Sequence, residues 1–248
     1  MLSCRMSRKR YFWALGTMLL VSMSAMAEPA DEKSIDPWEP MNRGIFRFND
    51  TLDRYTLKPL AEGYRWITPD PVERGVNNVF RNLQEIRNLI NQLLQGKPIE
   101  AASDTARFLV NSTVGIVGIF DVASHIGLER HEEDFGQTLA VWGVPQGPYL
   151  VLPFFGPSSP RGAVGFTMDV YVHPLNEVDD VRVRNSLTAL DLASRRADLL
   201  KVEDVIFGDR YIFIRDAYLQ QRQALINDGN TEDDEFVDEF GGDFDETF

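Results

Sequence analysis

The sequence predicts a mainly α-helical protein whose helices form one domain over residues 36–227. Three observations predict this fold class. Apolar residues recur at spacings of three and four over most of this range, as they do along one face of an amphipathic helix. Residues that begin and end helices stand at the edges of these stretches. No segment alternates apolar and polar residues as a β-hairpin does, and no repeat recurs at a fixed period.

Residues 1–27 are typical of a secretory signal peptide. Four basic side chains in residues 5–10 precede an apolar run over residues 11–21, and Ala-Met-Ala at residues 25–27 fits a cleavage site. The alternative is a transmembrane anchor. A bilayer span needs about 20 apolar residues, however, and this run is much shorter.

Cys4 is the only cysteine of the chain and precedes the apolar run. Lipoprotein processing cannot use a cysteine at that place, so we expect no acyl chain on the mature protein. A single cysteine also excludes an intramolecular disulfide and a zinc site built from cysteines. Residues 28–35 form a short polar lead-in to the domain.

The first helix of the domain is predicted over residues 36–56. Asp36 is expected at its N-cap, because its side chain can accept a hydrogen bond from a free backbone N–H. Pro37 would then take the first helical position, where its missing N–H costs nothing. A short amphipathic segment follows at residues 57–67.

The clearest helical pattern covers residues 70–95. Asp70 and Glu73 resemble a capping box at its start, and Gly96 and Pro98 end it. The apolar positions fall on one stripe of the helix; they are Val72, Val76, Val79, Phe80, Leu83, Ile86, Ile90, Leu93 and Leu94.

The remaining elements follow in order. We predict a helix from residue 98 into the apolar stretch 108–120, a short helix in 132–143, an extended or irregular segment at 149–155, a helix over 159–172, and two long amphipathic helices at 178–206 and 209–226.

The stretch 108–120 carries no charged residue and is the most informative feature of the domain. As a helix it would be about 20 Å long, shorter than the roughly 30 Å hydrocarbon core of a bilayer. Three structural roles are possible for this stretch: a buried core helix, a hairpin that enters one leaflet, or the wall of an apolar cavity. Its position in the middle of the domain favours the core helix.

Aromatic and basic residues gather near the start of the domain. Trp38, Phe46, Phe48, Tyr55, Tyr64 and Trp66 lie among Arg43, Arg47, Arg54, Lys58 and Arg65. Such a mixture is typical of a surface at the membrane interface. An amphipathic helix that packs its aromatic side chains inward explains the pattern equally well.

The chain is acidic, with 25 Lys and Arg against 38 Asp and Glu and a formal net charge of −13. This balance argues against nucleic acid as a partner, because phosphate backbones need a basic surface. Residues 228–248 contain only acids among their charged residues and are predicted to be a disordered tail. The alternative is a docking motif, since Phe236, Phe240, Phe244 and Phe248 recur at every fourth position.

The sequence contains no established catalytic motif for a nucleophile elbow, a phosphate loop, a zinc protease or a dinucleotide site. His125 and His131 lie near several acids, but their spacing matches no zinc pattern, so no metal and no cofactor are expected. Ser158 and Ser159 precede Arg161 without a general base nearby, and a helix start explains them better than a nucleophile does.

Four segments of the domain resemble the MlaA family, also called VacJ, of the Gram-negative outer membrane. They are Asp36-Pro37-Trp38-Glu39-Pro40-Met41-Asn42-Arg43 with Phe46, Phe48 and Asn49; Asn82-Leu83-Gln84-Glu85 with Leu94-Gln95-Gly96; residues 107–112 with Gly115, Gly118, Asp121 and Ala123; and residues 134–139 followed by Trp142-Gly143-Val144, Gly147-Pro148-Tyr149, Leu152-Pro153-Phe154, Gly156-Pro157-Ser158 and Arg161. The resemblance covers residues 36–227.

This resemblance implies a ring-shaped bundle of amphipathic helices with a central amphipathic channel, lying on the periplasmic side of the outer membrane. It implies that phospholipid misplaced in the outer leaflet passes through the channel to a soluble periplasmic carrier, which maintains lipid asymmetry. A trimeric porin is the implied membrane partner. No bond needs to be broken, so the expected protein is not an enzyme.

Two sets of residues are candidates for these roles. The lipid-channel or leaflet-facing set is Phe108, Val110, Val114, Ile116, Val117, Ile119 and Phe120. The gating or orienting set, from the helix that matches the family near the start of the domain, is Asn42, Phe46, Phe48 and Asn49.

The sequence departs from the family pattern in lacking the lipoprotein cysteine, in having Gly162 where relatives often carry an acid, and in its acidic tail. The missing cysteine leaves a soluble periplasmic lipid carrier open as an alternative function. A lipid hydrolase and a purely structural role in the envelope are further alternatives.

Overall fold

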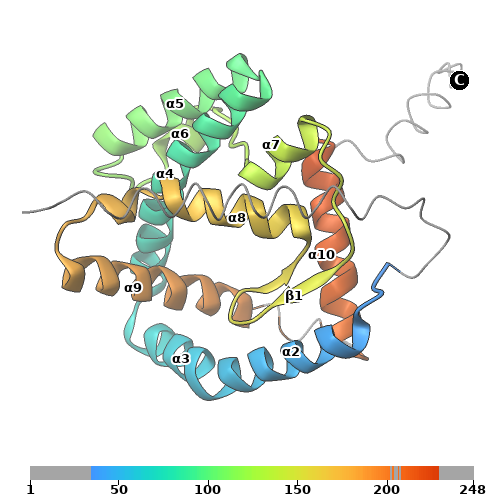
Figure 1. The fold of residues 1–248 in the computed structure, drawn as a ribbon. Coiled ribbons are helices and arrows are strands. Elements are labelled where there is room, and N and C mark those ends of the chain that lie inside the picture. Colours follow the sequence, from blue (N-terminus) through green and yellow to red (C-terminus); the bar gives the residue numbers. More distant parts are fainter. Residues whose placement is uncertain (1–34, 202, 204–205, 207, 229–248) are drawn as a thin grey trace, which may run out of the picture. The chain divides into compact units, whose positions relative to one another are not determined.

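The computed structural model describes residues 35–201, 203, 206 and 208–228. These residues are mainly helical, which confirms the predicted fold class (Figure 1). The proposed signal peptide, Cys4 and almost all of the proposed acidic tail lie outside the described residues. From Asp36 onward the described residues belong to one compact unit.

In chain order the elements are α2 (Glu39–Leu52), the π-helix η1 (Asp53–Leu57), α3 (Lys58–Ile67), α4 (Asp70–Gln95), α5 (Pro98–Thr113), α6 (Val122–His125), α7 (Phe135–Val141), β1 (Leu150–Leu152), β2 (Gly156–Ser158), α8 (Pro160–Val172), the 3₁₀ helix η2 (Pro174–Glu177), α9 (Val181–Leu200) and α10 (Arg210–Ile226). Helix α4 packs against α5, α7 and α9, while α7 packs on α8 and α3 on α9. The strand β1 lies against α2, and α10 contacts α7 and β2.

The first helix begins later than the sequence suggests. It starts at Glu39 with Pro40 in its first turn, so the predicted N-cap at Asp36 and first helical position at Pro37 are wrong. Asp36 is buried instead and accepts hydrogen bonds from Asn42 Nδ2, at 2.8 Å, and from the Tyr211 hydroxyl. Its carboxylate therefore connects the start of the domain to α10 rather than capping a helix.

A π-helix joins α2 to α3 where the sequence suggests a helix end near residue 56. Over Asp53–Leu57 the backbone hydrogen bond from the Lys58 N–H reaches Asp53 O, one residue further than in an α-helix. Asp53 itself holds Arg196 of α9 through two hydrogen bonds of 2.7 and 2.8 Å. The π-helix is thus fixed against α9.

Helix α4 has the predicted bounds, but its buried face is not the predicted one. It ends at Gly96, whose φ of 78° is the left-handed conformation that glycine adopts readily. The capping box at its start is absent, because Glu73 is buried and accepts from Lys201 Nζ at 2.7 Å. Val72 and Leu93 of the apolar stripe are exposed, whereas the polar side of the helix is buried.

Residues 149–158 contain a two-stranded antiparallel hairpin, which the sequence did not predict. Val151 pairs with Pro157, and each strand is three residues long. Strands this short show no measurable alternation, and prolines at both ends of the first run point to irregular backbone. The turn between them includes Phe154 with a φ of 69° and Gly156 with a φ of 83°.

Helices α8 and α10 begin within one residue of their predicted starts, whereas α9 covers Val181–Leu200 and is shorter at both ends than the predicted helix 178–206. Ser159 accepts from the Gly162 N–H and caps α8, which confirms the helix-start interpretation of Ser158-Ser159. Asp180 and Asp209 cap α9 and α10 in the same way. Helix α8 approaches α7 at Gly165, where an added Cβ would lie 2.6 Å from Gly136 Cα.

Buried polar and charged side chains outnumber buried hydrophobic ones among the described residues. The hydrophobic core is small and consists of Tyr149, Val151 and Tyr211 with partly buried neighbours from α2 and α10. Many large hydrophobic side chains are exposed instead, Trp66 and Tyr55 among them. None of the described helices combines the length and apolar character needed to cross a bilayer.

Candidate functional site

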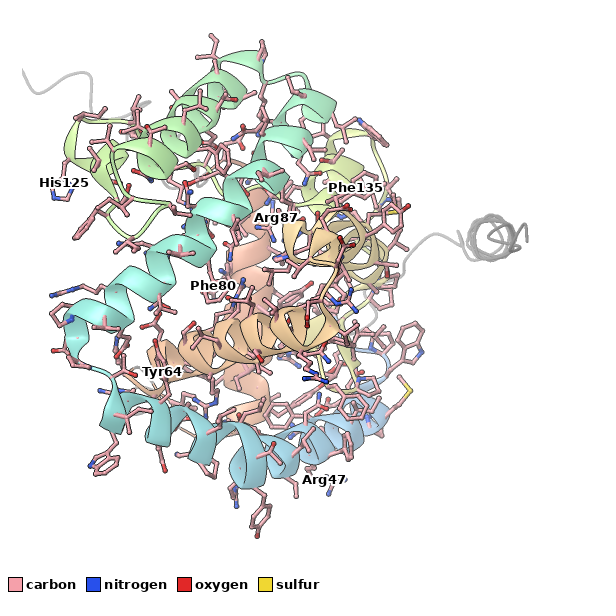
Figure 2. All side chains as sticks on the ribbon, turned by 90° about the vertical axis from the view of Figure 1, so that its left-hand side faces the viewer. Arg47, Tyr64, Phe80, Arg87, His125 and Phe135 are labelled. Atoms are coloured by element: carbon pink, nitrogen blue, oxygen red, sulfur yellow. The ribbon has the colours of Figure 1, made fainter. Side chains whose placement is uncertain are left out.

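The polar side of α4 forms a continuous buried stripe, which we call the polar stripe of α4. Its buried members are Asn82, Glu85, Asn88, Asn91 and Gln92, which recur every three or four residues, and the half-buried Gln95 continues it. Figure 2 shows Phe80 and Arg87 on the same helix, on the side that faces α9. The stripe binds several elements: Asn82 donates to Ser112 of α5 at 2.9 Å, and Asn91 accepts from Thr138 of α7 at 2.9 Å.

The sequence analysis did not single out this stripe, although its spacing was visible. Asparagine, glutamine and glutamate recur opposite the apolar positions of residues 70–95. Helices that associate in an apolar medium cannot use the hydrophobic effect, so they use hydrogen bonds and close contact instead. The polar stripe of α4 is this kind of contact surface.

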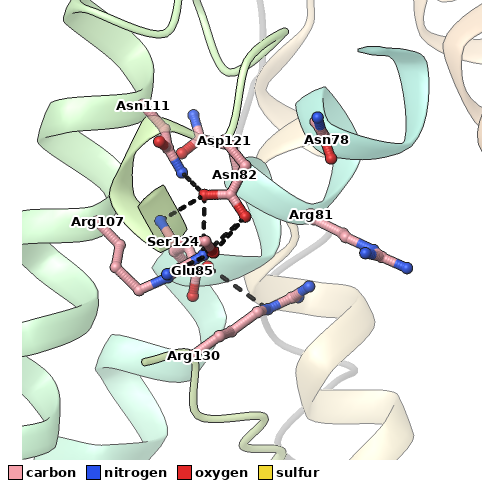
Figure 3. Close-up of a pocket in the computed structure, with 9 residues that line it drawn as sticks. All are labelled: Asn78, Arg81, Asn82, Glu85, Arg107, Asn111, Asp121, Ser124 and Arg130. Atoms are coloured by element: carbon pink, nitrogen blue, oxygen red, sulfur yellow. Dashed lines mark hydrogen bonds and ion pairs between the residues drawn. The ribbon is translucent and has the colours of Figure 1, made fainter. Parts of the chain in front are cut away.

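Arg107 of α5 is the centre of a cluster of charged side chains beside the polar stripe (Figure 3). Its Nε lies 3.4 Å from Glu85 Oε1, and its Nη2 donates to both oxygens of Asp121 at 3.2 and 3.3 Å. Its Nη1 donates to Ser124 Oγ and to the Leu128 carbonyl. The side chains of Arg107 and Glu85 are 3% and 2% exposed. A cavity of about 170 Å³ adjoins the cluster.

The two carboxylates of the cluster differ in their pKa. Burial raises the pKa of Glu85, and the attraction of Arg130 and Arg107 does not offset it. Burial also raises the pKa of Asp121, but hydrogen bonds from Ser124 and Asn111 outweigh this effect and bring the pKa to about 2. Asp121 is therefore the permanently charged partner of Arg107 at neutral pH.

We expect the stabilisation from Asp121 to disappear in acid. Its pKa is lower in the folded chain than in the unfolded one, so its contribution is complete above about pH 4 and is lost as the pH falls through about 2. The measurement compares urea unfolding of the wild type and Asp121→Asn between pH 7 and pH 2. The difference in free energy of unfolding should shrink over the lower part of this range, and a constant difference would contradict it.

Residues 114–120 form an exposed turn rather than a helix, and we call them the apolar loop. Helix α5 ends at Thr113, so the prediction of a buried core helix through residues 108–120 is wrong. The loop's apolar side chains face solvent; the exposed fractions are 67% for Val114, 57% for Ile116, 68% for Val117, 41% for Ile119 and 58% for Phe120. Phe108 and Val110, in the last turns of α5, are half-buried.

Glycines explain why the apolar loop turns. Gly115 and Gly118 are buried while their neighbours are exposed, and Gly118 has a φ of 87°. A Cβ on Gly118 would lie 2.7 Å from Asn82 Cβ, so only glycine allows the loop to approach the polar stripe of α4 this closely. The glycines pack inward and the β-branched residues are left outside.

Ile116 and Val117 carry backbone strain. Their φ angles are 54° and 58°, a left-handed conformation that costs a β-branched residue about 1–2 kcal/mol. Exposed strained residues of this kind are typical of functional sites.

We expect Val117→Asn to raise the free energy of unfolding by about 1 kcal/mol, because asparagine tolerates the left-handed conformation. Val114→Asn is the matched control, since Val114 is equally exposed but has a φ of −70°. Urea unfolding followed by circular dichroism in a mild detergent measures both. Equal changes in the two variants would show that the loop is not strained.

Two asparagine side chains of α2 form hydrogen bonds with the backbone of the hairpin. Asn42 donates to Tyr149 O at 3.1 Å and accepts from Val151 N at 2.9 Å. Asn49 donates to Leu152 O at 2.9 Å and accepts from Phe154 N at 2.8 Å. Seven residues of helix advance about 10.5 Å, and three residues of strand advance about 10 Å. The two asparagines are therefore spaced to match the hairpin backbone.

The aromatic residues of α2 pack in two directions. Phe46 lies edge-on against Tyr211 with ring centroids 5.5 Å apart, and Phe48, which is exposed, contacts Phe154 at 5.3 Å. Trp66 is 87% exposed. Of the two interpretations of the aromatic cluster, inward packing holds for Phe46, while Trp66 belongs to the outer surface. The structure thus brings all four residues of the gating set to the hairpin and α10.

Asn42→Ala is expected to lower the free energy of unfolding by about 2–3 kcal/mol. The side chain is fully buried, so its loss leaves Val151 N, Tyr149 O and Asp36 short of partners that water cannot replace. Asn49→Ala should cost only about 1 kcal/mol, because water reaches this half-buried site. Thermal unfolding measures both, and a larger effect at Asn49 would contradict the prediction.

The histidines of the predicted polar loop have separate partners. His125 Nδ1 lies 2.8 Å from Asp121 O, and His131 Nδ1 lies 3.2 Å from Asp104 Oδ1. The described residues contain no group of three or more side chains placed to hold a metal ion. Ser158 and Ser159 are buried, and Arg161 Nη1 donates to Val144 O at 2.9 Å.

A polar interior held by hydrogen bonds and an exterior rich in apolar side chains define a class of protein. This class is that of mainly helical proteins whose surface suits an apolar environment. The family model described as MlaA lipoprotein matches residues 34–225, and the chain belongs to this family.

Individual relatives agree with this assignment. The intermembrane phospholipid transport system lipoprotein MlaA of Escherichia coli is 34% identical over 222 residues, which cover 87% of this chain and 88% of the relative. An uncharacterized protein of Rickettsia typhi is 36% identical over 195 residues, 77% of this chain and 78% of its own length. A solved chain described under the structural basis for maintenance of bacterial outer membrane lipid asymmetry has a TM-score of 0.67 and 32% identity, and the match covers 77% of this chain and 98% of that one.

Proposed function

We propose that the chain is a non-enzymatic component of phospholipid transport in the cell envelope, placed on the periplasmic side of the outer membrane. It removes phospholipid misplaced in the outer leaflet through an amphipathic channel and passes it to a periplasmic carrier. The named function of the Escherichia coli relative supports the transport role. The observation that carries the proposal is the unusual burial: among the described residues, buried polar and charged side chains outnumber buried hydrophobic ones, and many large apolar side chains are exposed.

The physical need for such a protein follows from the chemistry of the lipid. A phospholipid with two chains hides about 30 CH₂ groups, and their exposure to water costs roughly 24 kcal/mol at about 0.8 kcal/mol each. A transport path must therefore shield the chains and still accept a charged headgroup. Helices suit the apolar side of this path because they satisfy their own backbone hydrogen bonds.

The apolar loop is the part of the chain that we assign to the inner leaflet. Val114, Ile116 and Val117 present exposed apolar side chains on this turn, and an apolar surface of this kind suits contact with lipid. The loop is too short to span the bilayer, so it enters one leaflet only. Phe108, Val110, Ile119 and Phe120 complete the proposed lipid-facing set.

The hairpin and α2 are the parts that we assign to gating. Asn42 and Asn49 hold α2 on the hairpin, while Phe48 and Phe154 form an exposed aromatic contact beside them. A change in this contact would move α2 without disturbing the polar stripe of α4. A trimeric porin is the proposed partner in the membrane, and a ring of helices is the proposed setting of the channel.

Gene deletion and complementation in cells test this proposal. Deleting the gene in the source bacterium should raise the phospholipid that an external lipase can reach in the outer leaflet, and the wild-type chain should restore the normal amount. The pair Ile116→Asp and Val117→Asp should fail to restore it, because two charges would enter the leaflet with the loop. The control pair Asn185→Asp and Ser186→Asp adds the same charge at an exposed site on α9 and should restore function fully.

Fractionation accompanies this experiment. We expect the wild-type chain in outer-membrane vesicles together with a porin. The proposal is wrong if the deletion leaves outer-leaflet phospholipid unchanged, and recovery of the chain in the soluble periplasmic extract would favour the carrier function instead.

A further inference from the structure

A cavity of about 250 Å³ lies between α4, α9 and the segment around residue 130. Four arginines line it: Arg81 and Arg87 of α4, Arg130, and Arg195 of α9. Arg81 and Arg130 also line the smaller cavity next to Arg107. The arginines thus form one basic surface that connects the two cavities.

The three acids at this cavity each have a cationic partner of their own. Asp191 binds Arg195 at 2.8 Å, and Asp198 binds Lys201 at 2.8 Å. Glu132 lies 3.6 Å from Arg130. Each acidic side chain of the lining is therefore already paired with a cation. Arg195 is paired with Asp191 in the same way.

Arg81 and Arg87 have no ion pair or side-chain hydrogen bond within the described ranges. The Arg87 Nε is buried without a hydrogen-bond partner. Asp169 is near enough to feel its charge: burial raises the pKa of Asp169 to about 6 against the opposing effect of Arg87. The carboxylate of Asp169 nevertheless accepts its hydrogen bonds from Asn91 Nδ2 and from the Phe135 N–H.

Arg130 also has a buried Nε that makes no hydrogen bond. Its Nη2 donates to Gln84 Oε1 at 3.1 Å and its Nε lies 3.5 Å from Glu85 Oε1, but the Nε makes no hydrogen bond. A buried guanidinium N–H without an acceptor is destabilising, because it has given up its hydrogen bonds to water. Two such donors at one cavity indicate an acceptor that binds there.

The size and charge of the cavity define that acceptor. Its volume is below the roughly 300–1,000 Å³ of pockets for drug-sized molecules, so it suits a compact group and not a whole lipid. Guanidinium groups bind phosphate oxygens through pairs of parallel hydrogen bonds. The available donors come from α4 and from the loop that carries Arg130, and three guanidinium groups match the several oxygens of a tetrahedral phosphate.

We propose that the cavity between Arg81, Arg87 and Arg130 binds the phosphate group of a phospholipid headgroup. The inference rests on the proposed transport function for the source of the phosphate, while the anion site itself rests on the arginines. The apolar exterior would then hold the acyl chains as the arginines hold the headgroup.

Calorimetric titration of the full chain in neutral detergent tests the site. The soluble probe is glycerophosphoethanolamine, with ethanolamine and inorganic phosphate as comparisons. The lipid probe is phosphatidylethanolamine in the same micelles, with diacylglycerol as its comparison. Arg81→Gln with Arg87→Gln should weaken binding of both phosphodiesters by on the order of 10- to 100-fold.

Two further variants make the result specific. Arg74→Gln removes an exposed arginine of α4 outside the cavity and should change nothing. Arg81→Lys with Arg87→Lys keeps the charge but loses the paired hydrogen bonds, so it should recover part of the affinity. Circular dichroism of all variants should show the wild-type fold, because neither arginine holds a carboxylate.

Each outcome decides the question. Equal binding by wild type and the double glutamine variant would overturn the site, as would binding of inorganic phosphate without phosphatidylethanolamine. If the double glutamine variant binds the headgroup as tightly as the wild type while the wild-type chain restores lipid asymmetry in cells, the site is overturned and the transport function stands. Intact binding by a chain whose deletion does not change outer-leaflet phospholipid overturns the transport function alone.

Discussion

Replacing Arg107 by methionine is expected to lower the free energy of unfolding by about 3–5 kcal/mol, the cost of removing one partner from a buried ion cluster. Methionine fills a similar volume but takes from Glu85, which is 2% exposed, one of its two cationic neighbours and leaves Arg130 at 3.5 Å. Asp121, Ser124 and Leu128 O lose donors at the same time. Urea unfolding in a mild detergent measures the loss.

A surface arginine provides the control for Arg107. Arg54 pairs with Asp50 at 2.9 Å one helical turn away, and its side chain is 66% exposed. Arg54→Met should cost only about 0.3–0.5 kcal/mol. Adding Glu85→Gln to Arg107→Met should recover part of the stability, because it removes a buried charge that has lost one of its two cationic neighbours. If the double variant were less stable than Arg107→Met, the charge cluster would not be the cause.

Gly165→Ala is expected to cost about 3 kcal/mol or more, because the new methyl group meets backbone and not a flexible side chain. Its Cβ would lie 2.6 Å from Gly136 Cα and 3.1 Å from the Phe135 carbonyl carbon. Helix α8 would have to move away from α7 and would disturb the hydrogen bonds that the Phe135 N–H donates to Asp169. Thermal unfolding should show a clear fall in the melting temperature.

Gly63→Ala is the matched control for Gly165. Gly63 lies inside α3 and a Cβ there would meet nothing within 4 Å. Alanine should therefore stabilise the chain by roughly 0.5–1 kcal/mol through its better helix propensity. A destabilising Gly63→Ala or a neutral Gly165→Ala would show that close backbone contact does not limit this fold.

The sequence was sufficient to predict where helices begin and end, because these signals are local. Gly96 ends α4 and Ser159 caps α8 through hydrogen bonds within a few residues of each other. Asp36 was assigned wrongly for the opposite reason. Its partners include Tyr211, 175 positions away, and no local pattern reveals such a contact.

The face that each helix buries could not be predicted from hydropathy. An amphipathic pattern shows that α4 has two sides but not which of them meets the other helices. The usual assumption in water is that the apolar side is inside, and Val72 and Leu93 contradict it. The regular recurrence of Asn82, Glu85 and Asn88 was the signal that could have corrected the assumption.

The apolar loop was misassigned because a continuous apolar run fits a buried helix as well as an exposed turn. Glycines such as Gly115 and Gly118 allow close contact, and Gly118 approaches Asn82 closely. The direction of the contact was the missing information. Glycines that pack inward leave the intervening Ile116 and Val117 with only outward positions.

The π-helix at Asp53–Leu57 gives this fold a place where chain length can change with little consequence. A hydrogen bond there spans one residue more than in an α-helix, so losing one residue from this turn yields an ordinary α-helix. Losing one residue between Asn42 and Asn49 would instead rotate one of them by about 100° away from the hairpin. Insertions and deletions tolerated during evolution should therefore concentrate at the π-helix and avoid residues 43–48, which separate the two asparagines.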